Sequence, residues 1–454
     1  MSASPAEKAV IMPVGRPRKP RPRRSGLRPA PGVTFAGLGV PGPLVAVLAQ
    51  GGITTPRPIQ AAVLPDALAG LDILGGAQTG SGKTLGFSLP LVARLAGRHT
   101  MACRPRGLVL VPTRELATQV QAVLSPLAGA MGLTVAAIFG GTPQRPQVTA
   151  LGNRADIVVA CPGRLADLIG QGHCHLGDVE AVVLDEADQM ADLGFLPVVR
   201  QLLEATPPEG QRLLFSATLD REVDVLARRF LTRPARHDVG AAPPAQIVHH
   251  LLTVTPADRA GVVTALASGE ARVLIFTRTR RGARKLARQL TMAGTPAAEL
   301  HGDLAQGARS RNLAAFGSGE VRAMVATDIA ARGLHVDGIG LVIHADPPAG
   351  HKAYVHRSGR TARSGAAGTV VTVQTAAQAA GVRALMRKAG VTPCASAASP
   401  GSAVLRSIAG PPARRTAPVA RLARPAPAAA HATGRGAVAA SGGFRGRRRP
   451  GWRG

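Results

Sequence analysis

The chain has 454 residues, of which 45% are hydrophobic, so it is long enough for two or three domains with real cores. Four cysteines without metal-ligand spacing or a disulfide framework argue against structural zinc and disulfide scaffolds, and no apolar run approaches the roughly 18 residues of a membrane span. A net charge of +29 favours a polyanionic partner, with RNA or DNA ahead of anionic membrane, and we expect a cytoplasmic protein without membrane contact.

The positive charge is concentrated at the two ends of the chain. Residues 1–31 are rich in Pro and Arg, and residues 401–454 carry eleven Arg and no acidic residue. Because neither end can bury enough apolar surface to fold alone, we expect disordered tails over 1–31 and 395–454. The second tail ends with Arg interleaved with Phe444 and Trp452, a composition that suits phosphate attraction and base stacking. The alternative is that the Arg-rich tails only keep the chain soluble.

Between the tails, short β-branched runs alternate with helical patterns, which predicts an α/β fold with parallel sheets covered by helices. A Gly- and Pro-rich break predicts a linker at 238–246, between one domain at 32–237 and another at 247–394. The candidate strands include 107–111, 135–139, 157–160, 181–184, 213–216, 273–277, 297–300, 323–326, 341–345 and 369–374.

A candidate phosphate-binding loop lies between the apolar run Ile73-Leu74 and a helical pattern that starts near Leu85. In such a loop, backbone N–H groups and a helix N-terminus face the phosphates, a Lys adds charge and a Thr hydroxyl ligates Mg²⁺. The strict pattern begins with Gly rather than Ala, and an ordinary glycine turn is the alternative. The loop comprises Ala77, Gln78, Thr79, Gly80, Ser81, Gly82, Lys83 and Thr84.

An acidic cluster, Asp185-Glu186-Ala187-Asp188, follows the candidate strand 181–184. Ligands of doubly wound sheets bind at that carboxyl edge. Asp185 can hold the Mg²⁺ on which Thr84 also acts, and Glu186 can orient and deprotonate a water for attack on a γ-phosphate. A solvated acidic turn is the alternative.

From about Phe35 to Thr372 these motifs resemble the DEAD-box ATP-dependent RNA helicases of superfamily 2, of bacterial type. The resemblance implies two RecA-like domains, ATP and Mg²⁺ as cofactors, and RNA-stimulated hydrolysis coupled to local unwinding of short duplexes or to ribonucleoprotein remodelling. It implies single-stranded and short duplex RNA as partners, bound with little sequence preference. Ribosome or RNA-degradation assemblies are further candidate partners, and we expect a monomer.

The resemblance also assigns roles near the adenine. Phe35, Arg57 and Gln60 are similar to the family's adenine-reading motif, in which a carboxamide donates to N7 and accepts from the N6 amine while an aromatic ring stacks. In the expected second domain, His335 stands where the family usually has Asp. If that position binds the ribose, the loss of a charge-assisted hydrogen bond predicts weaker or pH-sensitive ATP binding.

RNA contacts are implied in both domains. Cys161 stands where the family usually has Thr, and the lost hydroxyl is expected to weaken RNA binding by about 1 kcal/mol. The residues that match the family's RNA-binding motifs are Pro112, Thr113, Arg114, Gly141, Arg164, Thr277, Gln306, Arg309 and Thr327.

Two further motifs concern coupling and catalysis. Ser216 and Thr218 resemble the segment that, with Asp188, couples hydrolysis to strand separation, and His356 is expected to link the second domain to the acids of the first. Arg360 and Arg363 resemble arginine fingers that complete a catalytic set with Lys83 and Glu186. Ala362 replaces the usual Gly, which predicts a mild backbone restriction.

Because half of this site lies on each domain, hydrolysis should require domain closure, and RNA and ATP should tighten each other's binding. One alternative is an RNA-annealing protein whose core closes on ATP as a clamp, motivated by Cys161, His335 and Ala362. Another is a DNA translocase of the same superfamily, which Gln60 and the acidic cluster at 185–188 disfavour.

Overall fold

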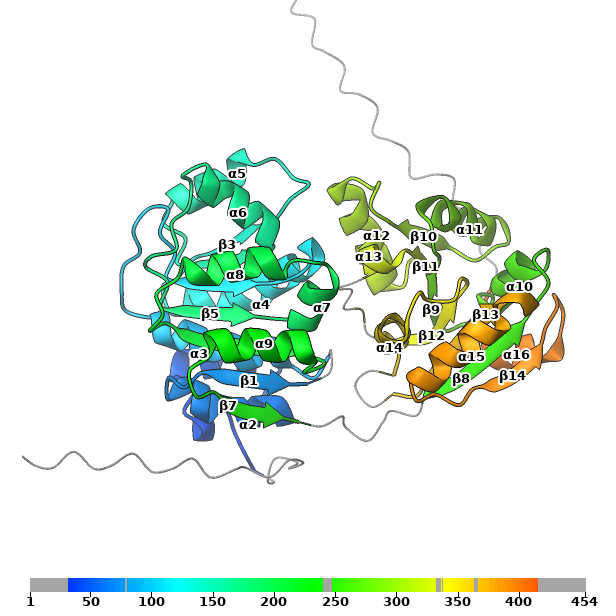
Figure 1. Ribbon diagram of the computed structural model, residues 1–454, viewed down its shortest axis with the longest axis horizontal. Coiled ribbons are helices and arrows are strands. Elements are labelled where there is room, and N and C mark those ends of the chain that lie inside the picture. Colours follow the sequence, from blue (N-terminus) through cyan, green and yellow to red (C-terminus); the bar gives the residue numbers. More distant parts are fainter. Residues whose placement is uncertain are drawn as a thin grey trace, which may run out of the picture.

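Figure 1 shows the computed structural model of the chain, which describes residues 32–77, 80–239, 247–331, 336, 338–362 and 366–414. The expected tail 1–31 and most of the expected linker 238–246 lie outside these ranges. Asp238, which the sequence assigns to the linker, is the last residue of strand β7 (Ala235–Asp238). Within these ranges no helix is both long and apolar enough to cross a bilayer.

The first domain is built on a seven-stranded sheet in the order β3-β4-β2-β5-β6-β1-β7, in which all pairings are parallel. Its other strands are β1 (Ile73–Gly76), β2 (Gly107–Leu110), β3 (Val135–Ile138), β4 (Ile157–Ala160), β5 (Ala181–Leu184) and β6 (Gln211–Ser216). Its helices are η1 (Ala36–Leu38), α1 (Gly42–Gln50), α2 (Pro58–Leu68), α3 (Lys83–Leu95), α4 (Arg114–Ala130), α5 (Arg145–Gly152), α6 (Pro162–Gly170), α7 (Ala187–Asp192), α8 (Leu196–Glu204) and α9 (Arg221–Phe230).

The second domain repeats this plan with the strand order β10-β11-β9-β12-β13-β8-β14, again parallel throughout. Its strands are β8 (Ile247–Thr253), β9 (Arg272–Phe276), β10 (Ala297–Leu300), β11 (Ala323–Ala326), β12 (Ile339–His344), β13 (Gly368–Gln374) and β14 (Cys394–Ala397). Its helices are α10 (Arg259–Leu266), α11 (Arg280–Met292), α12 (Gln306–Ser318), α13 (Asp328–Ala331), α14 (His351–Ser358), η2 (Ala376–Gln378), α15 (Ala379–Lys388) and α16 (Ala403–Ala409).

Each sheet has a hydrophobic core on both faces, because neighbouring residues of a strand point to opposite sides. In β9, Val273 and Ile275 belong to one core cluster, whereas Leu274 and Phe276 belong to the other. Both faces are covered by helices, so the central strands are near-continuous runs of Val, Ile, Leu and Ala rather than alternating patterns.

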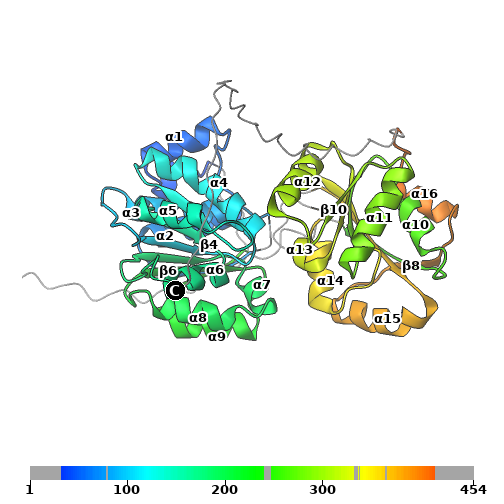
Figure 2. The ribbon, with the colours of Figure 1, turned by 90° about the horizontal axis from the view of Figure 1, so that it is seen from above.

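Strand order brings three loops together at the carboxyl edge of the first sheet. The parallel strands β5, β6 and β1 are consecutive neighbours, with Leu184 paired to Leu214 and Gly76 to Ser216. The loop after β1, the acidic cluster after β5 and the end of β6 therefore meet. Viewed from above, the second domain turns α12, α13 and α14 toward the first domain (Figure 2).

The expectation of a disordered tail from residue 395 is wrong for residues 395–414. Strand β14 pairs with the edge strand β8, and α16 packs on α10 with Leu405 2% exposed. A side chain at Gly269 would collide with the carbonyl of Ala409, so this close approach requires glycine. Backbone pairing and a few buried side chains thus order a segment whose composition alone predicts disorder.

We expect Leu405→Ala to lower the free energy of unfolding by about 2–3 kcal/mol, because it leaves a cavity between α16 and the sheet. The measurement is denaturant unfolding of the full chain. Ser407→Ala, on the exposed side of the same helix, is the control and should stay within about 0.5 kcal/mol of the parent chain. Equal stabilities of the two variants would contradict this account of residues 395–414.

Candidate active site

The loop after β1 is held by residues of α2 and its N-cap. Arg57 Nη1 donates to the carbonyl of Gly80 at 2.6 Å, and Gln60 Nε2 donates to the carbonyl of Gly82 at 2.9 Å. Gln60 Oε1 accepts from the backbone N–H of Arg57 at 2.8 Å. Both amide atoms of Gln60 retain one further hydrogen-bonding position, which adenine recognition would use. Gln78 and Thr79 lie outside the described residues.

Gly82 is required by this arrangement for two reasons. Its φ of +94° lies in the left-handed region, and a Cβ would stand 2.6 Å from Gln60 Nε2 and 2.9 Å from Arg57 Cδ. The loop therefore turns sharply into α3, whose first residue is Lys83. This geometry places the first N–H groups of α3 and the Lys83 side chain at the carboxyl edge of the sheet.

Buried charge at this edge fits a triphosphate and a divalent cation. Lys83 is 5% exposed, and neither its Nζ nor the Ser81 hydroxyl makes a hydrogen bond within the part of the chain that the structure describes. Asp185 is 3% exposed, and burial raises its pKa to about 6 although Lys83 acts in the opposite direction. Phosphate oxygens would satisfy Lys83. The oxygens of Asp185 and Thr84 are the ligands that Mg²⁺ prefers.

Glu186, the expected general base, has an unusual backbone. Its φ of 53° and ψ of 50° place a non-glycine residue in the left-handed region, where it begins α7. Its N–H donates to Asp185 Oδ1 at 3.0 Å. Strain of this kind costs roughly 1–3 kcal/mol and is concentrated at functional sites.

Asp188 lies against the end of β6, as the sequence predicts. Its carboxylate accepts hydrogen bonds from both the backbone N–H and the hydroxyl of Thr218, each at 3.0 Å. Its own N–H donates to Ser216 Oγ at 3.2 Å. These hydrogen bonds hold the acidic cluster against residues 216–218, at the end of the neighbouring strand β6.

Phe35 does not have the geometry that adenine stacking needs. The ring is 2% exposed and belongs to the core cluster that also contains Leu44 and Ile59. The ring packs in a core to which α2 contributes Ile59 and Val63. The sequence identifies an aromatic residue near the motif but not the direction of its ring.

In the second domain, Arg360 and His356 border a small cavity together with Asp328 and Arg357. Arg357 forms a two-pronged ion pair with Asp328, at 2.5 and 2.7 Å, and its guanidinium lies 4.9 Å from the ring centroid of Phe276. This pair fixes α14, so that Arg360, at 5% exposure, is held at the end of that helix. Arg363 and His335 lie outside the described residues.

One interdomain contact joins α14 to the elements that follow the acidic cluster. His356 Nδ1 lies 3.9 Å from Asp192 Oδ2 at the end of α7, and Lys352 Nζ lies 2.7 Å from Asp220 Oδ2. The hydrogen bond to Asp220 raises the pKa of Lys352. His356 thus faces acids of the first domain as expected, whereas the sequence offers no signal for Lys352, Asp192 or Asp220.

A second interdomain contact involves two of the expected RNA-binding residues, Gln306 and Arg309. Arg309 is 4% exposed and pairs with Glu115 on α4, with Nη2 2.7 Å from Oε1. Gln306 Oε1 accepts from Arg114 Nη1 at 3.3 Å. Gln306 and Arg309 therefore lie in the domain interface rather than on an open RNA surface, because their partners are the charged side chains that begin α4.

The remaining expected RNA contacts follow the carboxyl ends of their strands. Arg114 closely approaches Gly141, where a Cβ would collide with its guanidinium, and Arg164 Nη1 donates to the carbonyl of Thr142 at 3.4 Å. Cys161 begins α6 without a side-chain cap, and burial raises the pKa of its thiol to about 12. The others are Pro112 (buried), Thr113 (the cap of α4), Thr277 (4% exposed) and Thr327 (half-buried).

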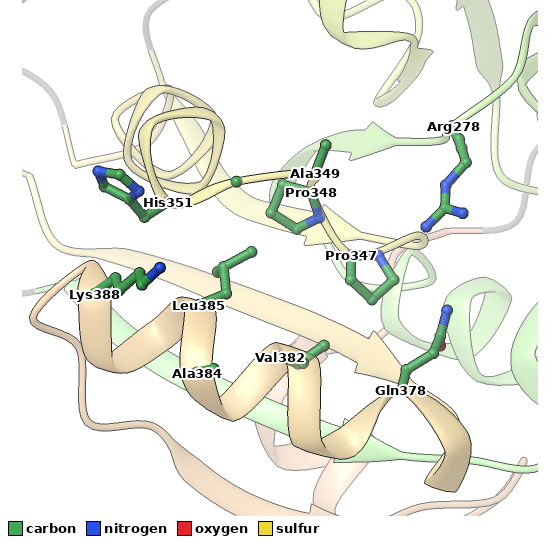
Figure 3. Close-up of a pocket in the computed structure, with 12 residues that line it drawn as sticks. Arg278, Pro347, Pro348, Ala349, His351, Gln378, Val382, Ala384, Leu385 and Lys388 are labelled. Carbon is green, nitrogen blue, oxygen red and sulfur yellow. The ribbon is translucent and has the colours of Figure 1, made fainter.

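A groove of about 490 Å³ lies apart from this site, between α15 and the turn before α14 (Figure 3). Pro347, Pro348 and Val382 form its apolar walls, and Lys388 lies at one end. No residue of the predicted ATP or RNA site lines it, so the groove contributes nothing to the chemistry above.

Two family models match the chain: "DEAD/DEAH box helicase" over residues 57–226 and "Helicase conserved C-terminal domain" over residues 259–365. DEAD-box ATP-dependent RNA helicase 30 of Arabidopsis thaliana is 39% identical over 79% of this chain and 62% of its own length. Helicase 20 of the same plant is 38% identical over 77% of this chain and 72% of its own length. ATP-dependent RNA helicase DBP2 of the yeast Meyerozyma guilliermondii is 39% identical over 77% of this chain and 65% of its own length.

Two solved structures share the fold. S. cerevisiae Dbp5 bound to RNA and ADP BeF3 has a TM-score of 0.73 and 25% identity, covering 83% of this chain and 98% of that one. Mss116p bound to ssRNA and AMP-PNP has a TM-score of 0.72 and 24% identity, covering 85% of this chain and 83% of that one. The predicted fold of two RecA-like domains is thereby confirmed.

The relatives named here are from plants and a yeast, so they do not support the narrower expectation of a bacterial type. The chain spans between 49% and 72% of the lengths of the curated relatives that it matches. Since one family model falls on each of the two sheets and relatives align along both, the chain belongs to the DEAD-box family of ATP-dependent RNA helicases.

Proposed function

We propose that this chain is an RNA-stimulated, Mg²⁺-dependent ATPase that unwinds short RNA duplexes or remodels ribonucleoprotein, acting as a cytoplasmic monomer. The observation that carries the proposal is the division of the site between two domains. Lys83, Asp185 and Glu186 belong to the first domain and Arg360 to the second, while interdomain ion pairs hold α14 beside α7 and α9.

In this proposal Lys83 and the N–H groups that begin α3 bind the phosphates, and Asp185 with Thr84 holds the Mg²⁺. Bound ATP supplies the phosphoanhydride whose hydrolysis drives the cycle. Glu186 accepts the proton of the attacking water, and the Arg360 guanidinium stabilises the negative charge that develops. Exposures of 3–5% at Lys83, Asp185, Glu186 and Arg360 support a site that excludes bulk water once closed.

Short helix α7 is the proposed coupling element. It starts at the acidic cluster and ends at Asp192, which faces Lys352 and His356 of the second domain. Asp188, inside α7, is bonded to Thr218, which lies just after the neighbouring strand β6. A change at the phosphates can therefore reach the second domain through six residues of helix, without a long pathway.

RNA is proposed to bridge the carboxyl edges of both sheets, with Arg114 and Arg164 on the first domain and Thr277 and Thr327 on the second. The Dbp5 neighbour was solved with RNA and ADP BeF3 bound, which supports RNA as the partner. Because RNA and ATP both favour the closed arrangement, each should tighten the binding of the other by the same factor.

The first test is steady-state ATP hydrolysis with and without single-stranded RNA. We expect strong stimulation by RNA in the parent chain and a loss of at least about 10²-fold in Glu186→Gln, which keeps the size of the side chain but removes the base. A matched control is Glu204→Gln on α8, whose carboxylate is half exposed and paired on the surface with Arg229.

ATP hydrolysis that RNA does not stimulate would contradict the proposal. If the parent chain binds RNA in an ATP-dependent way but hydrolyses nothing, the protein is instead a clamp or annealing factor. A DNA duplex used in place of RNA tests the translocase alternative, which predicts equal stimulation by DNA.

The buried pair Glu115–Arg309 should stabilise the closed state. Removing one partner of a buried pair leaves an uncompensated charge at a cost of about 3–5 kcal/mol. We therefore expect Glu115→Gln and Arg309→Gln each to weaken RNA binding at least tenfold in the presence of a non-hydrolysable ATP analogue. The double variant should lose less than the sum, because neither charge remains.

A double-mutant cycle on RNA affinity measures this coupling. Additive losses would show that the two side chains act separately. A neutral Glu115→Gln beside a damaging Arg309→Gln would restore the original expectation that Arg309 binds RNA directly.

Ala362, next to the second arginine finger, has a φ of +56°. A glycine avoids the roughly 1–2 kcal/mol that a Cβ costs in this conformation. We expect Ala362→Gly to raise the free energy of unfolding by about 1 kcal/mol. Thermal unfolding measures it, with Ala349→Gly as the control, where φ is not positive and no gain is expected. A lower melting temperature for Ala362→Gly would contradict the strain.

A further inference from the structure

Helix α11 of the second domain carries a line of unpaired cations along one exposed face. Arg281, Lys285 and Arg288 are spaced four and three residues apart, so they lie on one side of the helix. All three are exposed, and within the described ranges none forms an ion pair. Arg284, on the same face, lies 3.7 Å from Glu299. Arg281, Lys285 and Arg288 together form the α11 stripe.

The fold does not need the α11 stripe. The opposite face of the helix buries Ala283, Leu286, Ala287 and Leu290 in the core and packs the helix on the sheet. Replacing exposed side chains in such positions usually changes the free energy of unfolding of the protein very little. Their concentration on one face therefore points to a ligand outside the chain rather than to packing.

The α11 stripe starts next to the expected RNA path. Thr277 directly follows β9, and Thr279 caps α11 by accepting a hydrogen bond from the N–H of Gly282 at 3.0 Å. In Figure 1, α5 and α6 of the first domain and α12 and α11 of the second all lie along the upper side of the molecule. RNA that crosses the interface along this side would meet α11 after it passes α12.

We propose that the α11 stripe binds the phosphates of an RNA arm that flanks the strand held between the domains. This inference rests on the proposed RNA binding and extends it. Along the helix the stripe covers about 10 Å at 1.5 Å per residue, enough to meet more than one phosphate. A protein partner would need apolar or aromatic anchors, and the positions 281, 284, 285 and 288 are all cationic. Backbone contacts of this kind add affinity without sequence preference.

A matched control surface exists on α15. Arg383, Arg387 and Lys388 are also exposed and without ion pairs among the described residues, but α15 lies on the lower side in Figure 1, away from the expected path. Lys388 also borders the groove of Figure 3. Replacing three cations on either helix changes the net charge equally, so long-range attraction is matched and only the position differs.

The experiment compares two triple variants with the parent chain: Arg281→Gln/Lys285→Gln/Arg288→Gln on α11 and Arg383→Gln/Arg387→Gln/Lys388→Gln on α15. Fluorescence anisotropy measures RNA binding in the presence of a non-hydrolysable ATP analogue. One RNA is a short single strand that reaches only the site between the two domains, and the other is the same strand continued into a duplex arm. Gln keeps a good helix propensity, and circular dichroism checks folding.

We expect the α11 variant to bind the armed RNA about tenfold more weakly at low salt and to reduce the slope of log K against log salt by about 2. Its binding of the short strand should be unchanged, and the α15 variant should match the parent chain on both RNAs. Equal losses in the two variants would reduce the effect to net charge and overturn the proposal. Unchanged binding of the armed RNA by the α11 variant would also overturn the proposal, and an acidic protein would then be the better candidate for the ligand of the α11 stripe. If the parent chain binds neither RNA, the proposed function fails first and this inference falls with it.

Discussion

Charge buried at the carboxyl edge of the first sheet is the constraint on which this structure depends. Lys83 and Asp185 lie at the carboxyl edge of a sheet with 5% and 3% exposure, where water cannot fully compensate them. A charge in such surroundings is stabilised by an opposite charge brought from outside. A triphosphate with its divalent cation carries both signs in one ligand, so the same burial that raises the pKa of Asp185 favours nucleotide binding.

Parallel strand order explains why so few residues connect the nucleotide to the second domain. Because β5, β6 and β1 are neighbours, their following loops need no long excursions to meet. The short connection from β5 to α7 is accompanied by backbone strain at Glu186, which adopts a left-handed conformation. The turn directs α7 outward, and its last residue reaches the ion-pairing residues of α14.

The sequence predicts most of the fold because buried parallel strands have a clear signature in Val, Ile and Leu runs. It predicts the contact of Asp188 with Ser216 and Thr218 because those motifs follow adjacent strands. It does not predict that Arg309 pairs with Glu115, because a cation near the start of a helix suits a phosphate equally well and only the domain arrangement distinguishes the two. Composition likewise predicts a tail at residues 395–414, because pairing with β8 leaves no trace in composition.

The two interdomain contacts differ in exposure, and this gives ionic strength a selective effect. The Glu115 and Arg309 side chains are about 5% exposed, so dissolved ions screen their attraction weakly. Lys352 is 45% exposed and its attraction to Asp220 is screened readily, as is the attraction of surface cations for RNA. Rising salt should therefore release α14 and the RNA while the α4–α12 contact persists. The α4–α12 contact is therefore the part of the domain interface that depends least on ionic strength.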